Sequence, residues 1–450
     1  MFLVLVPVSD VAETLHQFVR GVPTRSRALA RRYHLGATLV APILFIFAIP
    51  PVAGTSAFAG PSPSGSTPVQ EATAVDGETD AKPVESGEEI EPAEQDTELA
   101  GWWERIRFSG DFRSRYEGFY QSERSTRNRF RMRLRLRLDS QINDDTRIGI
   151  QIASGDPGTP VSTNQTFTGF FRPKPFSLDR AFVAYNPKAQ SAMTLGVGKF
   201  GLPLTRTQMI YDDDLNVEGG WEAVSWKATD TVGINLVGVQ TAVNEFSHGG
   251  DTYMLGGYGE VNVDLGRTVF QFSAANYAWN NVDPIARASA IRSPITAILT
   301  NDVVRSDEGV VTGYASRFNV VDFIGQASFQ VGEGNYPVRF LVEYSRNTRA
   351  ANDRDSGFWT ELEFGSARDA GSFEVGYTYG WIQQDVTLSA FVFSDMPGTN
   401  LRLHMIETSW MLLANLSWDV TMHVSKRLDF GTNQNPNWLV RPHVAIVVSF

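Results

Sequence analysis

The sequence predicts an all-β fold, a transmembrane antiparallel β-barrel of about 16 strands with short periplasmic turns and long external loops. Three features of the chain lead to this fold class. Apolar residues recur at alternate positions, short and long connections alternate between the expected strands, and an alternating segment ends the chain on an aromatic residue. The 450 residues are 42% hydrophobic and 20% charged, which is too polar for a bundle of membrane-spanning helices.

The clearest alternating segment comprises residues 129–138. Its five arginines fall on one face of a strand, with phenylalanine, methionine and leucine on the other face. Five arginines turned toward lipid would cost roughly 10–20 kcal/mol, as much as the net stability of a whole domain. The arginines are therefore expected to face water, although this segment alone would also fit a soluble sheet. They are Arg129, Arg131, Arg133, Arg135 and Arg137.

The C-terminal segment argues against a soluble sheet. Val444, Ile446, Val448 and the terminal Phe450 share one face of the last strand, and polar residues occupy the other. An alternating strand that ends on an aromatic residue resembles the outer-membrane assembly signal, which the barrel-assembly machinery recognises. We expect these four residues to form that signal.

Sixteen segments are expected to form strands, with boundaries accurate to about two to four residues. They are 105–117, 127–140, 145–154, 178–187, 190–199, 219–228, 231–241, 251–264, 267–279, 318–330, 336–349, 355–367, 371–382, 401–411, 415–427 and 438–450.

The connections between these segments alternate in length. Short turns are expected near 143–145, 186–187, 229–230, 265–266, 332–334 and 369–371, and long polar loops at 155–177, 200–218, 280–317 and 383–400. This alternation is typical of barrels with periplasmic turns and external loops, and an even number of strands leaves both ends on the periplasmic side. The weakest turn is 412–415, which is apolar and could instead continue a helix.

Aromatic residues near the expected strand ends are typical of the girdles that lie at membrane interfaces. They are Trp221, Trp226, Tyr253, Tyr258, Trp410, Trp418 and Trp438. Similar residues occur in soluble sheets, so the girdles support the barrel only modestly.

Two segments precede the barrel, which is expected to occupy residues 101–450. Residues 1–59 form an extended N-region and a cleavable signal peptide, with arginines, an apolar stretch at 35–49 and cleavage after Ala59; an uncleaved anchor is the alternative. Residues 60–100 contain eleven acidic residues against the single Lys82, which predicts a disordered acidic periplasmic linker. A binding role for this linker is the less favoured interpretation.

Six motifs occur in order along the chain, at residues 107–113, 129–138, 162–166, 178–182, 198–200 with Pro203, and 212–219. Together they resemble the putative porin family of Gram-negative outer-membrane β-barrels. The resemblance is strongest over 105–225, and Val217 stands where the family more often has proline. It implies an outer-membrane barrel for passive transport, but no particular solute.

The lumen of such a barrel must be narrowed by side chains and inward-folded loops. We expect the five arginines to line one wall, and Asp212, Asp213 and Asp214 to form an opposing acidic wall. Opposed rows of charge orient dipolar solutes and favour ions of one sign, so a weak anion preference is the working hypothesis. Two alternatives stay open: the arginines pair with acids on neighbouring strands and only hold the wall, or the aspartates form a calcium loop or a solvated tip. Loop 155–177 is another candidate to enter the pore.

Enzymatic signatures are not found in the sequence. It contains no cysteine and no phosphate-binding, dinucleotide-binding or Gly-x-Ser-x-Gly motif, and its six histidines show no metal-ligand spacing. His423 and Ser425 share a strand face, which we interpret as incidental. We therefore expect no enzymatic activity, no cofactor and no metal, and the net charge of −11 argues against binding nucleic acid.

The expected function is an outer-membrane porin for passive diffusion of small hydrophilic solutes or ions. A substrate-selective channel, or a structural or adhesive barrel whose external loops bind a partner, are the alternatives. The expected partners are outer-membrane lipid and lipopolysaccharide, the barrel-assembly machinery and the solutes, with a homotrimer by analogy to general porins.

Overall fold

A computed structural model describes residues 105–292, 299–332, 336–429 and 435–450 of the chain. The expected signal peptide at 1–59 and the acidic linker at 60–100 lie outside the described residues. Among the described residues, no helix is long and apolar enough to cross a membrane.

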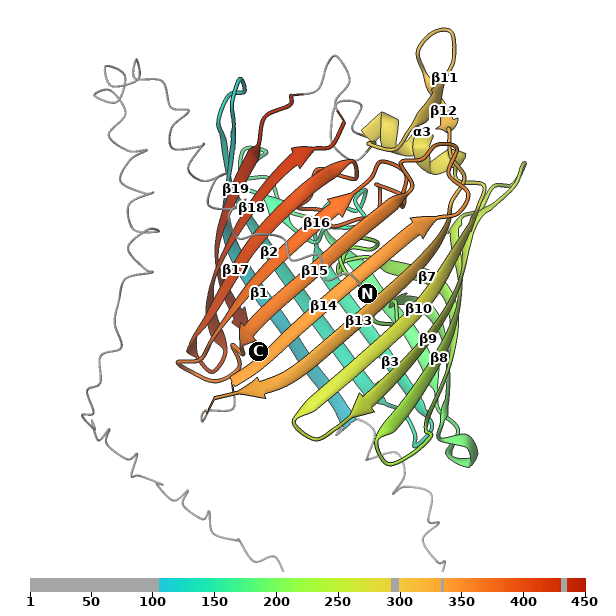
Figure 1. The fold of residues 1–450 in the computed structure, drawn as a ribbon, viewed down its shortest axis with the longest axis vertical. Coiled ribbons are helices and arrows are strands. Elements are labelled where there is room, and N and C mark those ends of the chain that lie inside the picture. Colours follow the sequence, from blue (N-terminus) through green and yellow to red (C-terminus); the bar gives the residue numbers. More distant parts are fainter. Residues whose placement is uncertain (1–104, 293–298, 333–335, 430–434) are drawn as a thin grey trace, which may run out of the picture. The chain divides into compact units, whose positions relative to one another are not determined.

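Sixteen long antiparallel strands form one closed sheet, because β1 pairs with both β2 and β19. Figure 1 shows the strands tilted around a barrel. The strands are β1 (Ile106–Gln121), β2 (Arg127–Gln141), β3 (Thr146–Ser154), β5 (Phe176–Tyr185), β6 (Met193–Gly201), β7 (Asn216–Lys227), β8 (Val232–Asn244), β9 (Thr252–Asp264), β10 (Thr268–Asn280), β13 (Asn319–Val331), β14 (Tyr336–Asn347), β15 (Ser356–Gly365), β16 (Phe373–Ile382), β17 (Leu401–Leu413), β18 (Leu416–Arg427) and β19 (Leu439–Ser449).

All sixteen expected strands are confirmed, and the structure adds elements that the sequence pattern did not indicate. A two-residue strand, β4 (Gln165–Thr166), pairs with β2. The long connection after β10 contains helix α3 (Asp283–Arg292) and a hairpin of β11 (Val303–Arg305) and β12 (Val311–Tyr314). These pieces are too short for periodicity to reveal them.

The barrel carries its apolar side chains on the outside. On β1 and β2, Phe108, Phe112, Phe130 and Leu136 are exposed, Phe108 to 77%, whereas the arginines between them are largely covered. Apolar side chains outside and charged side chains inside are the reverse of the arrangement in a soluble protein. This arrangement suits a lipid environment, in which apolar side chains need no protein cover.

Short and long connections alternate around the barrel, as expected. The short turns join strands at the end where β1 begins and β19 finishes, and the long loops lie at the other end (Figure 1). The connection from β17 to β18 is a tight turn at residues 414–415, so the helical alternative for this segment is wrong.

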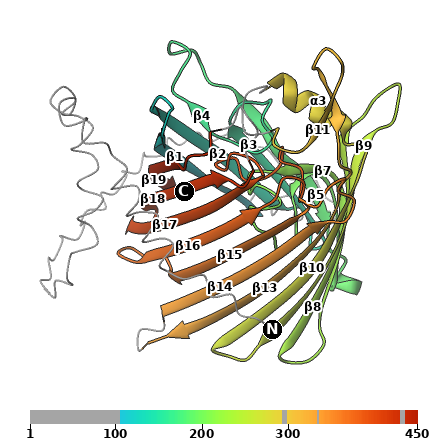
Figure 2. The ribbon, with the colours of Figure 1, turned by 45° about the horizontal axis from the view of Figure 1, so that its top comes forward.

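Two of the long loops fold inward, and we call residues 202–215 and 383–400 the inner loops. Figure 2 shows chain segments crossing inside the ring of strands. The inner loops bond to each other, with the backbone N of Asp212 2.8 Å from the Phe391 oxygen and the Phe393 N 3.1 Å from the Gln208 oxygen. Their apolar side chains form a buried core with the inner faces of the strands; it includes Met209, Ile210, Tyr211, Val386, Leu388, Trp359 and Leu401.

The expected aromatic girdle is only partly correct. Trp226, Tyr253 and Trp410 are exposed on the barrel surface, but Trp221 and Tyr258 are buried. Trp221 packs against Phe200 with ring centroids 4.3 Å apart, and Tyr258 hydrogen-bonds to Glu260. Both rings contact interior groups: Trp221 packs on the neighbouring β6, and the Tyr258 hydroxyl also accepts a 3.3 Å hydrogen bond from the backbone N of Thr205 in an inner loop.

The closing seam leaves no room for a side chain at Gly110. Gly110 exchanges two backbone hydrogen bonds with Phe450, and a Cβ there would lie 2.4 Å from the Arg135 oxygen and 2.8 Å from the Phe450 ring. Gly110→Val is therefore expected to lower the folded yield several-fold, measured by heat-modifiable migration on a gel. Gly257→Val is the control, since a Cβ there meets nothing within 4 Å. Equal yields from the two variants would contradict this account.

Candidate functional site

The five arginines of β2 are held by carboxylates. Arg133 Nη2 lies 2.6 Å from Asp111 Oδ1, and Arg135 Nε lies 2.6 Å from Asp111 Oδ2. Arg129 and Arg131 pair with Glu117, and Arg137 pairs with Asp139. The alternative in which acidic neighbours hold the arginines therefore has direct structural support. It does not exclude contact with solute, because Arg135 and Arg137 keep part of their side chains accessible.

The register of β1 and β2 makes these carboxylates necessary. Arg113 lies directly opposite Arg133, and Arg115 lies opposite Arg131. Like charges that face each other across a strand pair destabilise a sheet unless counter-charges intervene. Asp111 and Glu117 supply the counter-charge from β1 itself.

The three consecutive aspartates have three different environments. Asp212 is buried and accepts hydrogen bonds from the backbone N atoms of Asp214 at 2.7 Å and Ser394 at 2.6 Å. Asp213 is exposed and lies 3.5 Å from Arg206. Asp214 Oδ1 lies 3.3 Å from Arg135 Nη1.

This geometry corrects the expected opposing wall. Asp214 sits against the arginines instead of across from them, and Asp212 links the two inner loops. Because tertiary packing determines which groups a loop contacts, the sequence could not show which way these carboxylates point. Loop 155–175 also enters in part: Asn164 is buried and accepts a 2.8 Å hydrogen bond from Arg113, while Arg172 stays exposed.

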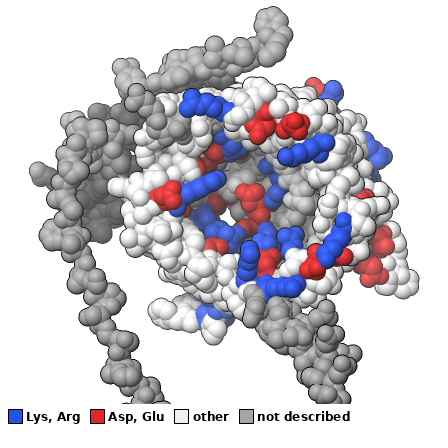
Figure 3. Space-filling model, turned by 90° about the horizontal axis from the view of Figure 1, so that it is seen from below, with Lys and Arg blue, Asp and Glu red and all other residues white. Residues whose placement is uncertain are grey.

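A different set of carboxylates shares a cavity with two arginines of β1. Glu363, Glu374 and Glu407 lie on β15, β16 and β17, and they share a cavity of about 360 Å³ with Arg113 and Arg115 of β1. Seen from the short-turn end, the hollow interior carries charges of both signs (Figure 3). An alternating pattern in the sequence indicates this acidic row, because Glu361 and Glu363 alternate with Leu362 and Phe364, which are exposed on the outside.

Asp395 connects an inner loop to the closing seam. Its carboxylate is 5% exposed, and its oxygens lie 2.9 Å from Arg115 and 3.2 Å from Arg441. Burial opposes ionisation, but these two guanidinium groups keep the pKa of Asp395 well below its usual range. Sequence reasoning missed this residue because its partner on β1 is 280 positions away.

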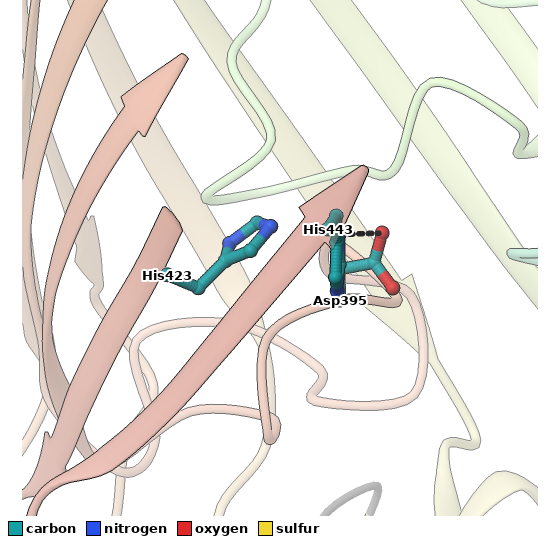
Figure 4. Close-up of side chains that lie close together, drawn as sticks. All are labelled: Asp395, His423 and His443. Atoms are coloured by element: carbon teal, nitrogen blue, oxygen red, sulfur yellow. Dashed lines mark ion pairs between the residues drawn. The ribbon is translucent and has the colours of Figure 1, made fainter. Parts of the chain in front are cut away.

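Asp395 also lies beside two buried histidines, His423 of β18 and His443 of β19 (Figure 4). The His443 Nδ1 atom is 3.9 Å from Asp395 Oδ2, and one candidate ligand atom from each of the three residues falls within a 4.8 Å span. Such a group resembles a transition-metal site. His423 and Ser425 are both buried on the inner face, which does not fit a hydrolase pair on the outer wall.

The surrounding charges disfavour a cation in this cluster. At an effective dielectric constant of 20, a dication about 4 Å from a guanidinium is repelled by ~8 kcal/mol, and Asp395 already binds two guanidinium groups. Four arginines pair here with only two carboxylates, Glu117 and Asp395. They are Arg115, Arg129, Arg131 and Arg441.

A closed antiparallel barrel with an apolar outer face and a charged, loop-narrowed interior defines a transmembrane β-barrel of the channel type. Residues 119–310 match the family described as Putative porin. This match agrees with the resemblance seen in the sequence and, together with the closed barrel, indicates a porin channel of the bacterial outer membrane. No curated protein matches the chain.

The chain also has a distant structural similarity to several solved porins. OmpF of Salmonella typhi in complex with daunomycin has 9% identity, a TM-score of 0.47, and coverage of 77% of this chain and 97% of its own. OprB of Pseudomonas putida at low pH has 11% identity and a TM-score of 0.45, and the match covers 79% of this chain and 95% of OprB. An anion-selective porin from Comamonas acidovorans has 11% identity and a TM-score of 0.46, and the match covers 77% of this chain and 99% of that porin. Likeness at this level says nothing about the solute.

Replacing Asp395 tests whether this carboxylate holds the inner loop. Asp395→Asn leaves Arg115 and Arg441 buried with Glu117 as their one remaining carboxylate among the described residues, and breaking a buried ion pair costs about 3–5 kcal/mol. Cleavage by chymotrypsin at Phe391 and Phe393 is expected to rise at least tenfold, since it follows the population of the opened loop. Asp369→Asn, in an exposed short turn, is the control. A cleavage rate like that of the control would show that Asp395 does not hold the loop.

The contact between the inner loops is expected to depend on pH. Burial and the nearby Asp214 raise the pKa of Asp212 to about 7. Because the folded pKa lies above the unfolded value of 3.8, the stabilisation is complete below pH 3.8 and is lost as pH rises through 7. Hydrogen exchange of residues 207–215 should therefore accelerate from pH 5 to pH 8 beyond its intrinsic rate. In Asp212→Asn this excess should vanish; if it persists, another group is responsible.

Proposed function

We propose that this porin is a passive channel whose selectivity is set by the arginines of β1 and β2 together with the glutamates of β15–β17. The single observation that supports this proposal is the cavity shared by Arg113, Arg115, Glu363, Glu374 and Glu407. Opposed rows of fixed charge create a field across a pore, which orients solutes and favours ions by local charge.

The arginine side is expected to give the channel a weak preference for anions. The guanidinium groups around Glu117 and Asp395 outnumber the carboxylates, so this part of the interior carries a positive surplus. A positive potential in a low-dielectric cleft raises the local concentration of anions. We assign the lining role to the arginines of β2 together with Asp214, and give Asp212 and Asp213 supporting roles in the inner loop.

Reversal potentials in planar bilayers with asymmetric KCl test the anion preference. Reversing Arg133 and Arg135 to glutamate is expected to abolish it, because both lie in the positive wall. Lys227→Glu, exposed at the short-turn end of β7, is the control. Since reversed charges can also impair folding, Arg137→Gln provides a milder variant and should lower the preference. An unchanged reversal potential in folded variants would refute the arginine wall.

Single-channel conductance separates the channel from its alternatives. Open steps support diffusion, whereas a silent bilayer would favour a structural or adhesive barrel that binds a partner through its external loops. A substrate-selective channel would show competition of current by its solute.

We also propose that four residues on the outer face of the last strand serve as the assembly signal: Val444, Ile446, Val448 and Phe450. We further propose that the protein forms a homotrimer, and that lipid and lipopolysaccharide contact its outer face.

A further inference from the structure

The cavity between β1 and β15–β17 has one basic and one acidic side. Arg113, Arg115 and His443 bound it on one side, and Glu363, Glu374 and Glu407 on the other. We call it the dipolar cavity. Its volume of about 360 Å³ lies at the small end of the range for ligand sites, ~300–1,000 Å³.

The basic side has more hydrogen-bond donors than acceptors. Arg115 is 5% exposed and His443 is 4% exposed. Within the described part of the chain, the Nε atoms of Arg113 and Arg115 have no hydrogen-bond partner. Leaving buried polar atoms unsatisfied is costly, so this side is suited to receive an acceptor from a solute.

The acidic side has carboxylates without counter-charges. Glu363 shares Arg339 with Glu361, but no ion pair to Glu374 or Glu407 occurs among the described residues. Asp419, which lines the same cavity, accepts a 2.6 Å hydrogen bond from Ser409 and has no ion pair within the described part of the chain. This side is therefore suited to receive a positive group.

We propose that the dipolar cavity binds zwitterionic solutes, amino acids or short peptides, during their passage. The inference rests on the proposed channel function. The solute carboxylate binds Arg113 and Arg115, and its ammonium group binds Glu374 and Glu407. A simple anion would meet the glutamates, and a simple cation would meet the guanidinium groups. Only a solute that carries both charges satisfies both sides.

Charge-matched probes test this inference in single-channel recordings. L-alanyl-L-alanine carries both charges, N-acetyl-L-alanine lacks the ammonium group, and L-alaninamide lacks the carboxylate. The dipeptide is expected to interrupt the current in a concentration-dependent way, at concentrations at least about tenfold lower than either probe. Equal interruption by N-acetyl-L-alanine would overturn the inference in favour of a simple anion site.

Variants assign the binding groups. The double substitution Glu374→Gln and Glu407→Gln should raise the dipeptide concentration for half-maximal interruption about tenfold or more and bring it close to that of N-acetyl-L-alanine. Glu123→Gln, in the turn between β1 and β2, is the matched control and should behave like the unchanged chain. If both variants respond equally, the glutamates do not bind the ammonium group and the assignment is wrong.

Two further outcomes separate this inference from what it rests on. Normal conductance without any dipeptide effect would overturn the zwitterion site and leave the channel function intact. Absence of conductance from folded barrels would overturn the channel function itself. Interruption by ZnCl₂ alone that disappears in His443→Ala would show that the region is a metal site, against the charge argument.

Discussion

The structure depends on the neutralisation of arginine charge at the seam where the barrel closes. β1 and β2 place arginines directly opposite one another, and β19 adds Arg441 beside them. Guanidinium groups cannot lose their charge by deprotonation, so each needs an acceptor inside the barrel. Asp111 and Glu117 come from β1, but Asp395 must come from a loop far along the chain. Closing the barrel and folding that loop inward are therefore linked.

This linkage explains why the interior has two different regions. Toward the long-loop end, the inner loops bring apolar side chains that pack against the strands as a conventional core. Toward the short-turn end, the walls are charged and the interior is hollow (Figure 3). Asp395 and Asp212 lie at the contacts of these loops, so ionisable groups control how firmly the loops are held. The loops narrow the lumen without any need for disulfides.

The strands could be predicted because their alternation is a local property. A period of two in residues 129–138 fixes which side chains share a face, whatever the rest of the chain does. Trp221 and Tyr258 show the limit of that reasoning. Each lies in a correctly predicted strand, but each packs inward on residues brought by an inner loop or a neighbouring strand. A sequence pattern predicts faces, whereas the surroundings of a face depend on distant contacts.

By itself, the sequence determined the closed barrel, its sixteen strands, the side on which the loops are long and the charged face of β2. It also indicated the porin resemblance that the match over residues 119–310 confirms. Only the tertiary structure decided which carboxylates pair with those arginines and which lie across the interior from them. Asp214 joined the arginine side, glutamates of β15–β17 took the opposite side, and Asp395 joined the seam. The physical reason is that alternation depends only on residues that are neighbours in the sequence. Ion pairing, in contrast, requires groups that only closure of the barrel brings within a few ångströms of each other.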